Sequence, residues 1–373
     1  MRRFLHQLSI TLAFFIPSSV YAAMEMNMPR GVTDTSHIIY DLHMLILWIC
    51  VAIGVVVFGV MFWSIFYHRK SQGAEASQFH ESTTVEVIWT VIPFLILIAM
   101  AIPSTSVLID MYDSSDSDID IQVTGYQWKW QYKYLGEDIN FFSSLITPKE
   151  EIANEQAKNT NYLLEVDNEL VLPINKKVRF LFTSNDVIHA WWMPDLAIKK
   201  DAIPGFINES WTRINEVGTY RGQCAELCGK NHGFMPIVVK AVTQYDYDIW
   251  VEEQQAAAIA KAAESEQEWT MDDLVAKGET VYQKNCAACH MVDGSGLPPA
   301  FPALNGSDVV LGDIETHMHM MYYGVPGSAM AAYGKQLSAV DLAAVITYKR
   351  NAWDNNTGEV ISPADMQAYI DKQ

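Results

Sequence analysis

Two long apolar segments lie near the start of the chain. Residues 42–66 and 87–109 are 25 and 23 residues without a formal charge. Each exceeds the roughly 20 residues that a membrane-spanning helix needs. Basic residues mark the cytoplasmic side of a span, and a basic group, His68–Lys70, follows the first segment directly. The pattern predicts a hairpin of two spanning helices over residues 38–110, with everything after Asp110 outside the cytoplasm.

The first 23 residues have a pattern of their own. A basic start at Arg2 and Arg3 is followed by a short apolar core and by small residues that end at Ala22 and Ala23. This order is typical of a secretory signal peptide, so residues 1–23 are expected to be removed after one of the two alanines. An uncleaved anchor is the alternative, and the shortness of the apolar core argues against it.

Beyond residue 111 the pattern changes to a period of two. Apolar and polar positions alternate in three places, at Ile119–Val123, Leu164–Val166 and Val178–Phe180. Turn signals such as Ile203-Pro204-Gly205 separate these runs. Short alternating runs between turns predict a β-sandwich over residues 111–250. Residues 140–161 are mostly polar and are expected to form a surface loop.

The remainder of the chain has helical character. Residues 251–269 are rich in Ala, Glu and Gln, which predicts a helical or semi-rigid linker. Thr270 is followed by Asp272 and Asp273, a pattern typical of the start of a helix. We therefore expect a third, all-α unit over residues 270–373.

Charge is distributed unevenly along the chain. Of the net charge of −19, −18 lies beyond residue 107. An acidic surface repels nucleic acid and favours a cationic protein partner, although solubility alone also explains it. Four of the five cysteines fall in two clusters. The fifth, Cys50, lies in an apolar run and is expected to be a small buried apolar side chain.

Metal-binding side chains are concentrated between Gln223 and Pro236. The run contains two thiols, an imidazole and a thioether, at Cys224, Cys228, His232 and Met235. A second imidazole, His189, lies upstream in Asp-Val-Ile-His-Ala-Trp-Trp-Met-Pro. Sulfur with imidazole selects copper or zinc, and a weak thioether favours copper. Because two thiolates can bridge two metals, the set predicts a dicopper electron-transfer centre. A disulfide would leave His232 and Met235 without a role, and zinc prefers four closed Cys/His ligands.

A second cluster, Cys286-Ala287-Ala288-Cys289-His290, has the C-x-x-C-H spacing of haem attachment. The two thiols add to the haem vinyl groups, and His290 is placed as the proximal iron ligand. The sixth ligand is expected to be a methionine, because Met/His ligation raises the haem potential. Met330, in a turn-like Val-Pro-Gly-Ser-Ala-Met segment, is the preferred candidate. Methionines at 318, 320 and 321 are the alternatives, in a helical run where core packing is commoner.

These features together resemble subunit II of haem–copper cytochrome c oxidases. The resemblance rests on the copper run, the His189 segment, the paired spans and four further motifs, Glu86–Pro93, Tyr126–Trp130, Leu164–Asn168 and Asp201–Gly205. It covers residues 30–245, and the remainder is similar to a fused class I cytochrome c. The resemblance implies a multidomain membrane protein: a transmembrane hairpin, a cupredoxin-like sandwich and an all-α cytochrome c domain.

The same resemblance implies roles for individual residues. The CuA ligands would be His189, Cys224, Cys228, His232 and Met235. Glu226 would supply a backbone carbonyl to copper and a carboxylate to a Mg²⁺ shared with subunit I. Trp128 is implied as the aromatic through which electrons reach CuA, and Glu86 as the start of the K proton pathway. Without the resemblance, Trp128 reads as a packed interfacial side chain and Glu86 as a carboxylate ending a helix.

The sequence departs from the family pattern at two positions. Asn185 stands where an acidic residue is frequent, on the surface that docks soluble cytochrome c, so docking is expected to have moved to the fused haem domain. Phe206 stands where a basic residue contacts subunit I.

The implied function is that of subunit II of a proton-pumping terminal oxidase. It would pass electrons from an external donor, such as a soluble cytochrome c, through haem c and CuA to the dioxygen-reducing site in subunit I. Subunits I and III would be its partners in a bacterial inner membrane, with the copper and haem domains periplasmic. The alternative is a membrane-anchored electron-relay module for another terminal reductase, and such modules lack the Glu86 hairpin. A quinol oxidase subunit would lack the copper ligands, and a purely structural subunit would not need two redox sites.

Overall fold

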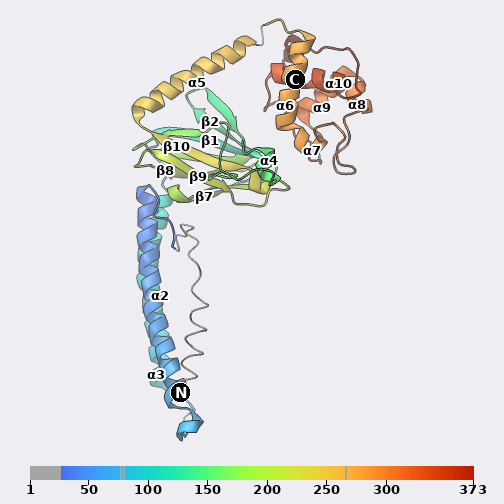
Figure 1. Ribbon diagram of the computed structural model, residues 1–373. Coiled ribbons are helices and arrows are strands. Elements are labelled where there is room, and N and C mark those ends of the chain that lie inside the picture. Colours follow the sequence, from blue (N-terminus) through green and yellow to red (C-terminus); the bar gives the residue numbers. More distant parts are fainter. Residues whose placement is uncertain (1–26, 76–77, 79, 265–266) are drawn as a thin grey trace. The chain divides into compact units, whose positions relative to one another are not determined.

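The structure is a computed structural model that describes residues 27–75, 78, 80–264 and 267–373 (Figure 1). The predicted signal peptide, residues 1–23, lies outside the described residues. The chain divides into two compact units: the first extends to Tyr247, and the second contains Asp248–Gln373 together with Glu137–Ile139.

The first unit begins with a helical hairpin. Helix α2 spans Asp34–Tyr67 and α3 spans Thr83–Tyr112, with a short 3-10 helix, η1 (Lys70–Gln72), between them. Both are long and apolar enough to cross a membrane, as the pattern predicts. Cys50 is exposed on α2 rather than buried. The prediction for Cys50 was wrong because these helices turn apolar side chains outward, as spanning helices do toward lipid or other subunits.

Ten strands in the described part of the first unit form two five-stranded sheets. The order in the first sheet is β3 (Ile139–Ser143), β2 (Lys129–Leu135), β1 (Ile119–Tyr126), β5 (Val178–Ser184) and β8 (Asn208–Thr212). The order in the second is β4 (Leu170–Pro173), β10 (Pro236–Val242), β9 (Gly218–Cys224), β6 (His189–Met193) and β7 (Ile198–Ala202). β1 and β5 run parallel, whereas β9 is antiparallel to both β10 and β6.

Aromatic side chains fill the space between the sheets. Phe180 and Phe182, on alternate positions of β5, lie 5.3 and 5.7 Å from Trp191 on β6, measured between ring centroids. All three are fully buried. Aromatic pairs at such distances add roughly 0.5–1.5 kcal/mol beyond burial of their area. The alternation predicted for β1 and β5 is confirmed.

Two local predictions for this unit were wrong. Residues 140–161 are not one loop, because they include most of β3 and a short helix, α4 (Lys149–Ile152). Phe141 packs on Tyr132 at 5.8 Å and Phe142 on Tyr126 at 5.3 Å, so aromatic contacts hold this segment at the sheet edge. The Leu164–Val166 segment makes only one isolated bridge, because Leu163 takes a left-handed φ of 61° just before it.

The second unit is helical. α5 (Gln244–Glu264) starts directly after the sandwich, at Gln244, before the range 251–269 in which the linker was expected, and it ends inside that range. The helices that follow are α6 (Met271–Asn285), α7 (Ala287–His290), α8 (Asp308–Leu311), α9 (Ile314–Tyr323), α10 (Ala339–Asn351) and α11 (Pro363–Ile370). Thr270 caps α6 by accepting a 3.2 Å hydrogen bond from Asp273 N–H, as predicted.

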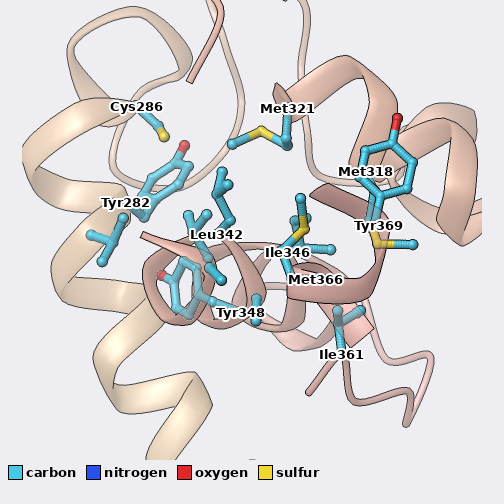
Figure 2. Close-up of a cluster of buried hydrophobic side chains, with 14 of the residues drawn as sticks. Tyr282, Cys286, Met318, Met321, Leu342, Ile346, Tyr348, Ile361, Met366 and Tyr369 are labelled. Carbon is cyan, nitrogen blue, oxygen red and sulfur yellow. The ribbon is translucent and has the colours of Figure 1, made fainter. Parts of the chain in front are cut away.

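The core of this unit forms where α6 crosses α10 (Figure 2). A Cβ on Gly278 would lie 2.1 Å from the carbonyl oxygen of Ala344, so only glycine permits this close crossing. Beside it the Tyr282 and Tyr348 rings lie 5.5 Å apart. The close contact fixes the end of α6, from which the Cys286–His290 segment continues.

Candidate copper and haem sites

Three strand ends of the second sheet meet at one edge of the sandwich. β9 ends at Cys224, β10 begins at Pro236 and β6 begins at His189. Because β9 is antiparallel to both neighbours, its end lies beside their starts. The loop from β9 to β10 is held there by two backbone hydrogen bonds, Cys224 N–H to Met235 O (3.3 Å) and Ala225 N–H to Ala190 O (3.0 Å).

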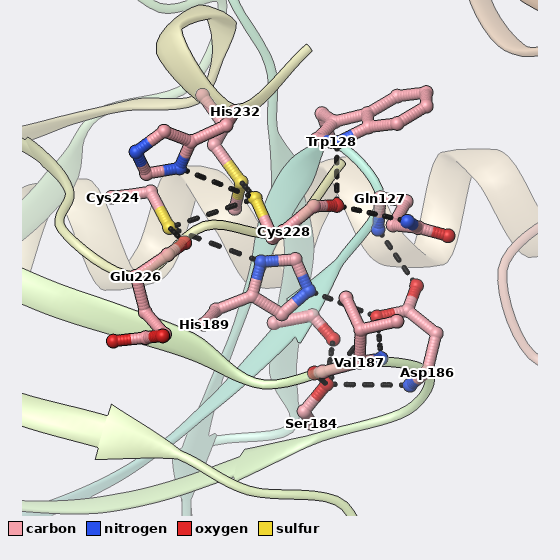
Figure 3. A network of polar contacts seen from close by, with 12 residues as sticks. Gln127, Trp128, Ser184, Asp186, Val187, His189, Cys224, Glu226, Cys228 and His232 are labelled. Carbon is pink, nitrogen blue, oxygen red and sulfur yellow. Dashed lines mark hydrogen bonds and ion pairs between the residues drawn. The ribbon is translucent and has the colours of Figure 1, made fainter. Parts of the chain in front are cut away.

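The predicted copper ligands come together at this edge (Figure 3). The sulfur atoms of Cys224 and Cys228 are 3.8 Å apart, and His189 Nδ1 lies 3.9 Å from the Cys224 sulfur. His232 Nδ1 and the Met235 sulfur each lie 3.5 Å from the Cys228 sulfur. The thiol pair therefore lies among two imidazoles and one thioether.

The spacing of these atoms fits a shared metal. Sulfur and nitrogen bound to one tetrahedral ion, at about 2.3 and 2.1 Å, lie about 3.6–3.8 Å from one another. The observed separations of 3.5 to 3.9 Å lie within about 0.1 Å of this range. Both cysteines are free thiols, not a disulfide. The donor set is soft and includes a thioether, which favours copper over zinc.

Burial and hydrogen bonds tune the ligands. Burial lowers the pKa of His189, but its contacts with Asp186 and Cys224 outweigh that effect and leave the pKa raised. The hydrogen bond between the two thiols, the largest cause for both, lowers the pKa of Cys224 and raises that of Cys228. One thiol of the pair is thus ready to act as a thiolate, the form that binds metals.

Asp186 orients the first imidazole. Its carboxylate lies 2.9 Å from His189 Nε2, so Nδ1 is left to face the thiols. The same carboxylate accepts the backbone N–H of Gln127 at 2.7 Å. Such outer partners fix the tautomer and ring orientation of a metal-binding histidine. The sequence places Asp186 three residues before His189, but its role was missed.

Trp128 is joined directly to the cluster. Its indole N–H donates a 3.0 Å hydrogen bond to the backbone carbonyl of Cys228, and the Gln127 side-chain amide donates to the same oxygen at 2.9 Å. The Trp128 side chain is partly exposed. The Trp128 side chain therefore connects solvent with the backbone of a cluster cysteine. The sequence did not reveal the contact that Gln127 makes with the same carbonyl.

The backbone carbonyl and the side-chain carboxylate of Glu226 point in different directions. Its backbone carbonyl oxygen lies 3.4 Å from the Cys224 sulfur, close enough to act as a further donor at the cluster. The residue is exposed, and its carboxylate points away from the thiols (Figure 3). The carboxylate is therefore free to meet another group at the surface.

The second unit contains a cavity of about 330 Å³ beside the C-x-x-C-H segment. Cys286, Cys289, His290 and Met330 all line it. Its volume lies in the range of roughly 300–1,000 Å³ typical of cofactor sites. His290 Nδ1 lies 2.9 Å from the Pro302 carbonyl and donates its hydrogen to it, which leaves Nε2 for a metal. Burial lowers the pKa of His290 and favours the neutral, ligating imidazole.

The candidate methionines differ in their surroundings. Met318 belongs to the buried core and is not among the residues that line the cavity. Met321 lines the cavity, but its sulfur already lies 2.9 Å from the Lys349 ammonium. Met330 sits on a loop held by Val325 N–H bonded to its carbonyl oxygen at 3.0 Å. Met330 and Met320 therefore remain available to a cofactor.

Glu86 lies far along the chain from both sites, in the first turn of α3. It is exposed, and its backbone N–H donates to Ser82 O at 3.0 Å. The structure does not bring it together with the other predicted site residues.

Comparisons with known proteins agree with this architecture. Residues 119–242 match the family described as cytochrome c oxidase subunit II, periplasmic domain, and residues 21–107 match its transmembrane domain. Residues 273–348 match cytochrome c oxidase, cbb3-type, subunit III.

Individual relatives cover much of the chain. A probable cytochrome c oxidase subunit 2 of Rickettsia conorii is 40% identical over 261 residues, which is 68% of this chain and 81% of the relative. That of Rickettsia felis is 39% identical over 222 residues, 59% of this chain and 69% of the relative. A crystal structure of the periplasmic domain of subunit II of cytochrome oxidase of Bradyrhizobium japonicum is 39% identical, covers 39% of this chain and 98% of that chain, and has a TM-score of 0.35. The chain thus belongs to the cytochrome c oxidase subunit II family.

Proposed function

We propose that this chain receives electrons for a proton-pumping terminal oxidase and delivers them, through haem c and a dicopper centre, to the dioxygen-reducing site of subunit I. Residues 38–110 would anchor it, residues 111–250 would hold copper, and a linker, residues 251–269, would lead to the haem domain, residues 270–373. The proposal locates it in a bacterial inner membrane, with both redox domains periplasmic. Its partners would be subunits I and III and an external donor such as a soluble cytochrome c.

The single observation that carries the proposal is the bond between Trp128 and the copper cluster. A partly exposed indole donates a hydrogen bond to the carbonyl of Cys228, whose sulfur is within 4 Å of three other donor atoms. A conjugated ring at the surface, one hydrogen bond from a metal ligand, is suited to accept electrons for that metal. We assign this role to Trp128.

For copper, we assign the ligands His189, Cys224, Cys228, His232 and Met235, with the carbonyl of Glu226. The Glu226 carboxylate would bind a Mg²⁺ shared with subunit I, which its exposed position supports. When bound, the copper centre and the haem accept and release single electrons. The protein's own contribution is to bury the thiols and to hold the His189 imidazole between Asp186 and Cys224, so that this ligand moves little on electron transfer.

For the haem, we assign Cys286 and Cys289 as the attachment thiols and His290 and Met330 as the iron ligands. The bond from His290 to Pro302 O supports the first iron ligand. The engagement of the Met321 sulfur with Lys349 supports Met330 over Met321. A thioether opposite an imidazole raises the haem potential.

We assign Glu86 to proton uptake on the cytoplasmic side. A carboxylate near the end of a spanning helix is costly unless it is hydrated or functional, and Glu86 is exposed in the first turn of α3. The match of residues 21–107 to the oxidase transmembrane domain favours an oxidase over a relay module for another reductase.

Cysteine substitution in the purified oxidase complex tests the copper assignment. Cys224→Ser and Cys228→Ser should abolish the mixed-valence EPR signal of copper and stop dioxygen uptake from a cytochrome c donor, while haem c remains attached. Cys50→Ser is the matched control, because Cys50 is an exposed thiol on α2, and should change none of these. Full copper content and turnover in either of the first two variants would overturn the proposal.

A further inference from the structure

The haem cavity is lined mainly by apolar side chains. Besides His290, two basic side chains line it, His317 on α9 and Lys349 on α10. The role proposed for His290 does not involve either of them. The surroundings of these two side chains show whether each has a hydrogen-bond or ion-pair partner.

His317 is 2% exposed, and neither of its ring nitrogens has a hydrogen-bond partner among the described residues. Leaving a buried polar group unpaired is destabilising, because the group has lost its water without gaining a partner. His319, two residues along the same helix, bonds Tyr369 Oη at 3.1 Å and has no such deficit. Burial first, and then the charge of Lys349, lower the pKa of His317, which leaves a neutral imidazole with one N–H to donate.

Lys349 is 3% exposed, and its ammonium lies 2.9 Å from the Met321 sulfur, a weak acceptor. Within the described parts of the chain no carboxylate lies in ion-pairing distance of it. The next residue, Arg350, differs: it pairs with Glu359 and donates to the carbonyls of Val310 (2.6 Å) and Gly312 (3.0 Å). A buried ammonium is expensive unless an anion accompanies it.

The cofactor that this cavity is proposed to hold would supply that anion. Haem carries two propionate carboxylates, and the cavity offers one unpaired cation and one unpaired imidazole donor. We propose that Lys349 and His317 bind the haem propionates, and that the charge of Lys349 raises the reduction potential of haem c. This inference rests on the proposed function, since it takes haem to occupy the cavity.

The effect on potential follows from charge. Ferric haem has one more positive charge than ferrous haem, so a buried cation nearby disfavours the ferric form. Removing the cation lowers the potential and makes haem c a stronger reductant. Lys349 is thus a tuning residue that acts on the haem without binding iron.

The test is a potentiometric titration of haem c in the purified complex. Lys349→Met keeps the length of the side chain and removes its charge, and should lower the midpoint potential. Lys349→Arg should restore it toward the wild-type value. Lys372→Met, at an exposed lysine near the C-terminus, is the matched control and should leave the potential unchanged.

Resonance Raman spectra provide a second readout, which reports on the propionates themselves. The propionate bending bands of the wild-type haem should shift in D₂O, because N–H donors bind the carboxylates, and should shift again in Lys349→Met and His317→Leu. An unchanged potential in Lys349→Met with haem attached, or propionate bands insensitive to both substitutions, would overturn this inference alone. A wild-type protein without thioether-bound haem in its pyridine haemochrome spectrum would overturn the proposed function itself.

Discussion

Gly125 on β1 leaves the space that the His189 imidazole occupies. An ideal Cβ at this position would lie 2.7 Å from His189 Cδ2 and 2.9 Å from Cγ. Carbon atoms pack best about 3.5–4.0 Å apart, so Gly125→Ala would push the ring by about 0.8 Å. The ring has little room, because it is fully buried and its Nε2 is held by a hydrogen bond with Asp186. Metal–ligand distances tolerate only about 0.2 Å, and we therefore expect the copper site to be damaged.

The size of the effect can be worked from overpacking. Forcing an extra methyl into a packed site costs about 1–3 kcal/mol. Without copper the ring can move away and relieve that strain, whereas binding copper requires the ring to return. Copper affinity is then expected to fall about 5- to 150-fold, at a factor of ten per roughly 1.4 kcal/mol.

The assay is copper content of the purified complex after dialysis against graded chelator, together with the mixed-valence EPR signal. Haem c content serves as the internal control for folding. Gly233→Ala is the matched control: it adjoins His232, but its added Cβ would meet no atom within 4 Å. The reasoning is refuted if Gly125→Ala keeps wild-type copper content, chelator resistance and EPR signal.

Substitutions test three further assignments. Met330→Leu should remove the sulfur-to-iron absorption band of haem c and lower its potential, whereas Met320→Leu should do neither; the reverse pattern would move the ligand to α9. Trp128→Phe removes the hydrogen bond to Cys228 and should slow reduction of copper at unchanged copper content, and an unaltered stopped-flow rate would contradict this role. Glu86→Ala should slow reduction of the dioxygen site in subunit I while transfer from haem c to copper stays fast; normal turnover would return Glu86 to an ordinary helix-end residue.

Much of the site could be read from the sequence because its chemistry is local. Cys224, Cys228, His232 and Met235 fall within one loop, and the structure brings their donor atoms within reach of one another. His189 was predicted from another segment, and the pairing of β6 with β9 places it beside Cys224. Side-chain type and spacing were enough to predict copper as the metal.

The groups around the ligands could not be predicted in the same way. Asp186, Gln127 and Gly125 come from different loops or strands, and their roles depend on how those ends meet in space. That Lys349 lacks a carboxylate partner could not be inferred either, because nothing in its local sequence distinguishes it from Arg350, which is also buried but pairs with Glu359.

In the fold, too, elements with a clear local sequence pattern were predicted, and an element fixed by contacts with distant residues was not. Apolar length predicted α2 and α3, and alternation predicted β1 and β5. The polar composition of residues 140–161 concealed β3, because Phe141 and Phe142 are fixed by rings on other strands rather than by a pattern of their own.

The central claim is that electrons pass from haem c to copper within this chain. Rapid mixing of the oxidised complex with a reduced cytochrome c, followed at the haem c band and the near-infrared copper band, tests it directly. We predict that haem c is reduced first and that copper follows, and that copper reduction slows in a Cys289→Ala complex with impaired haem attachment. Reduction of copper before haem c, or an equal rate in the Cys289→Ala complex, would contradict the account.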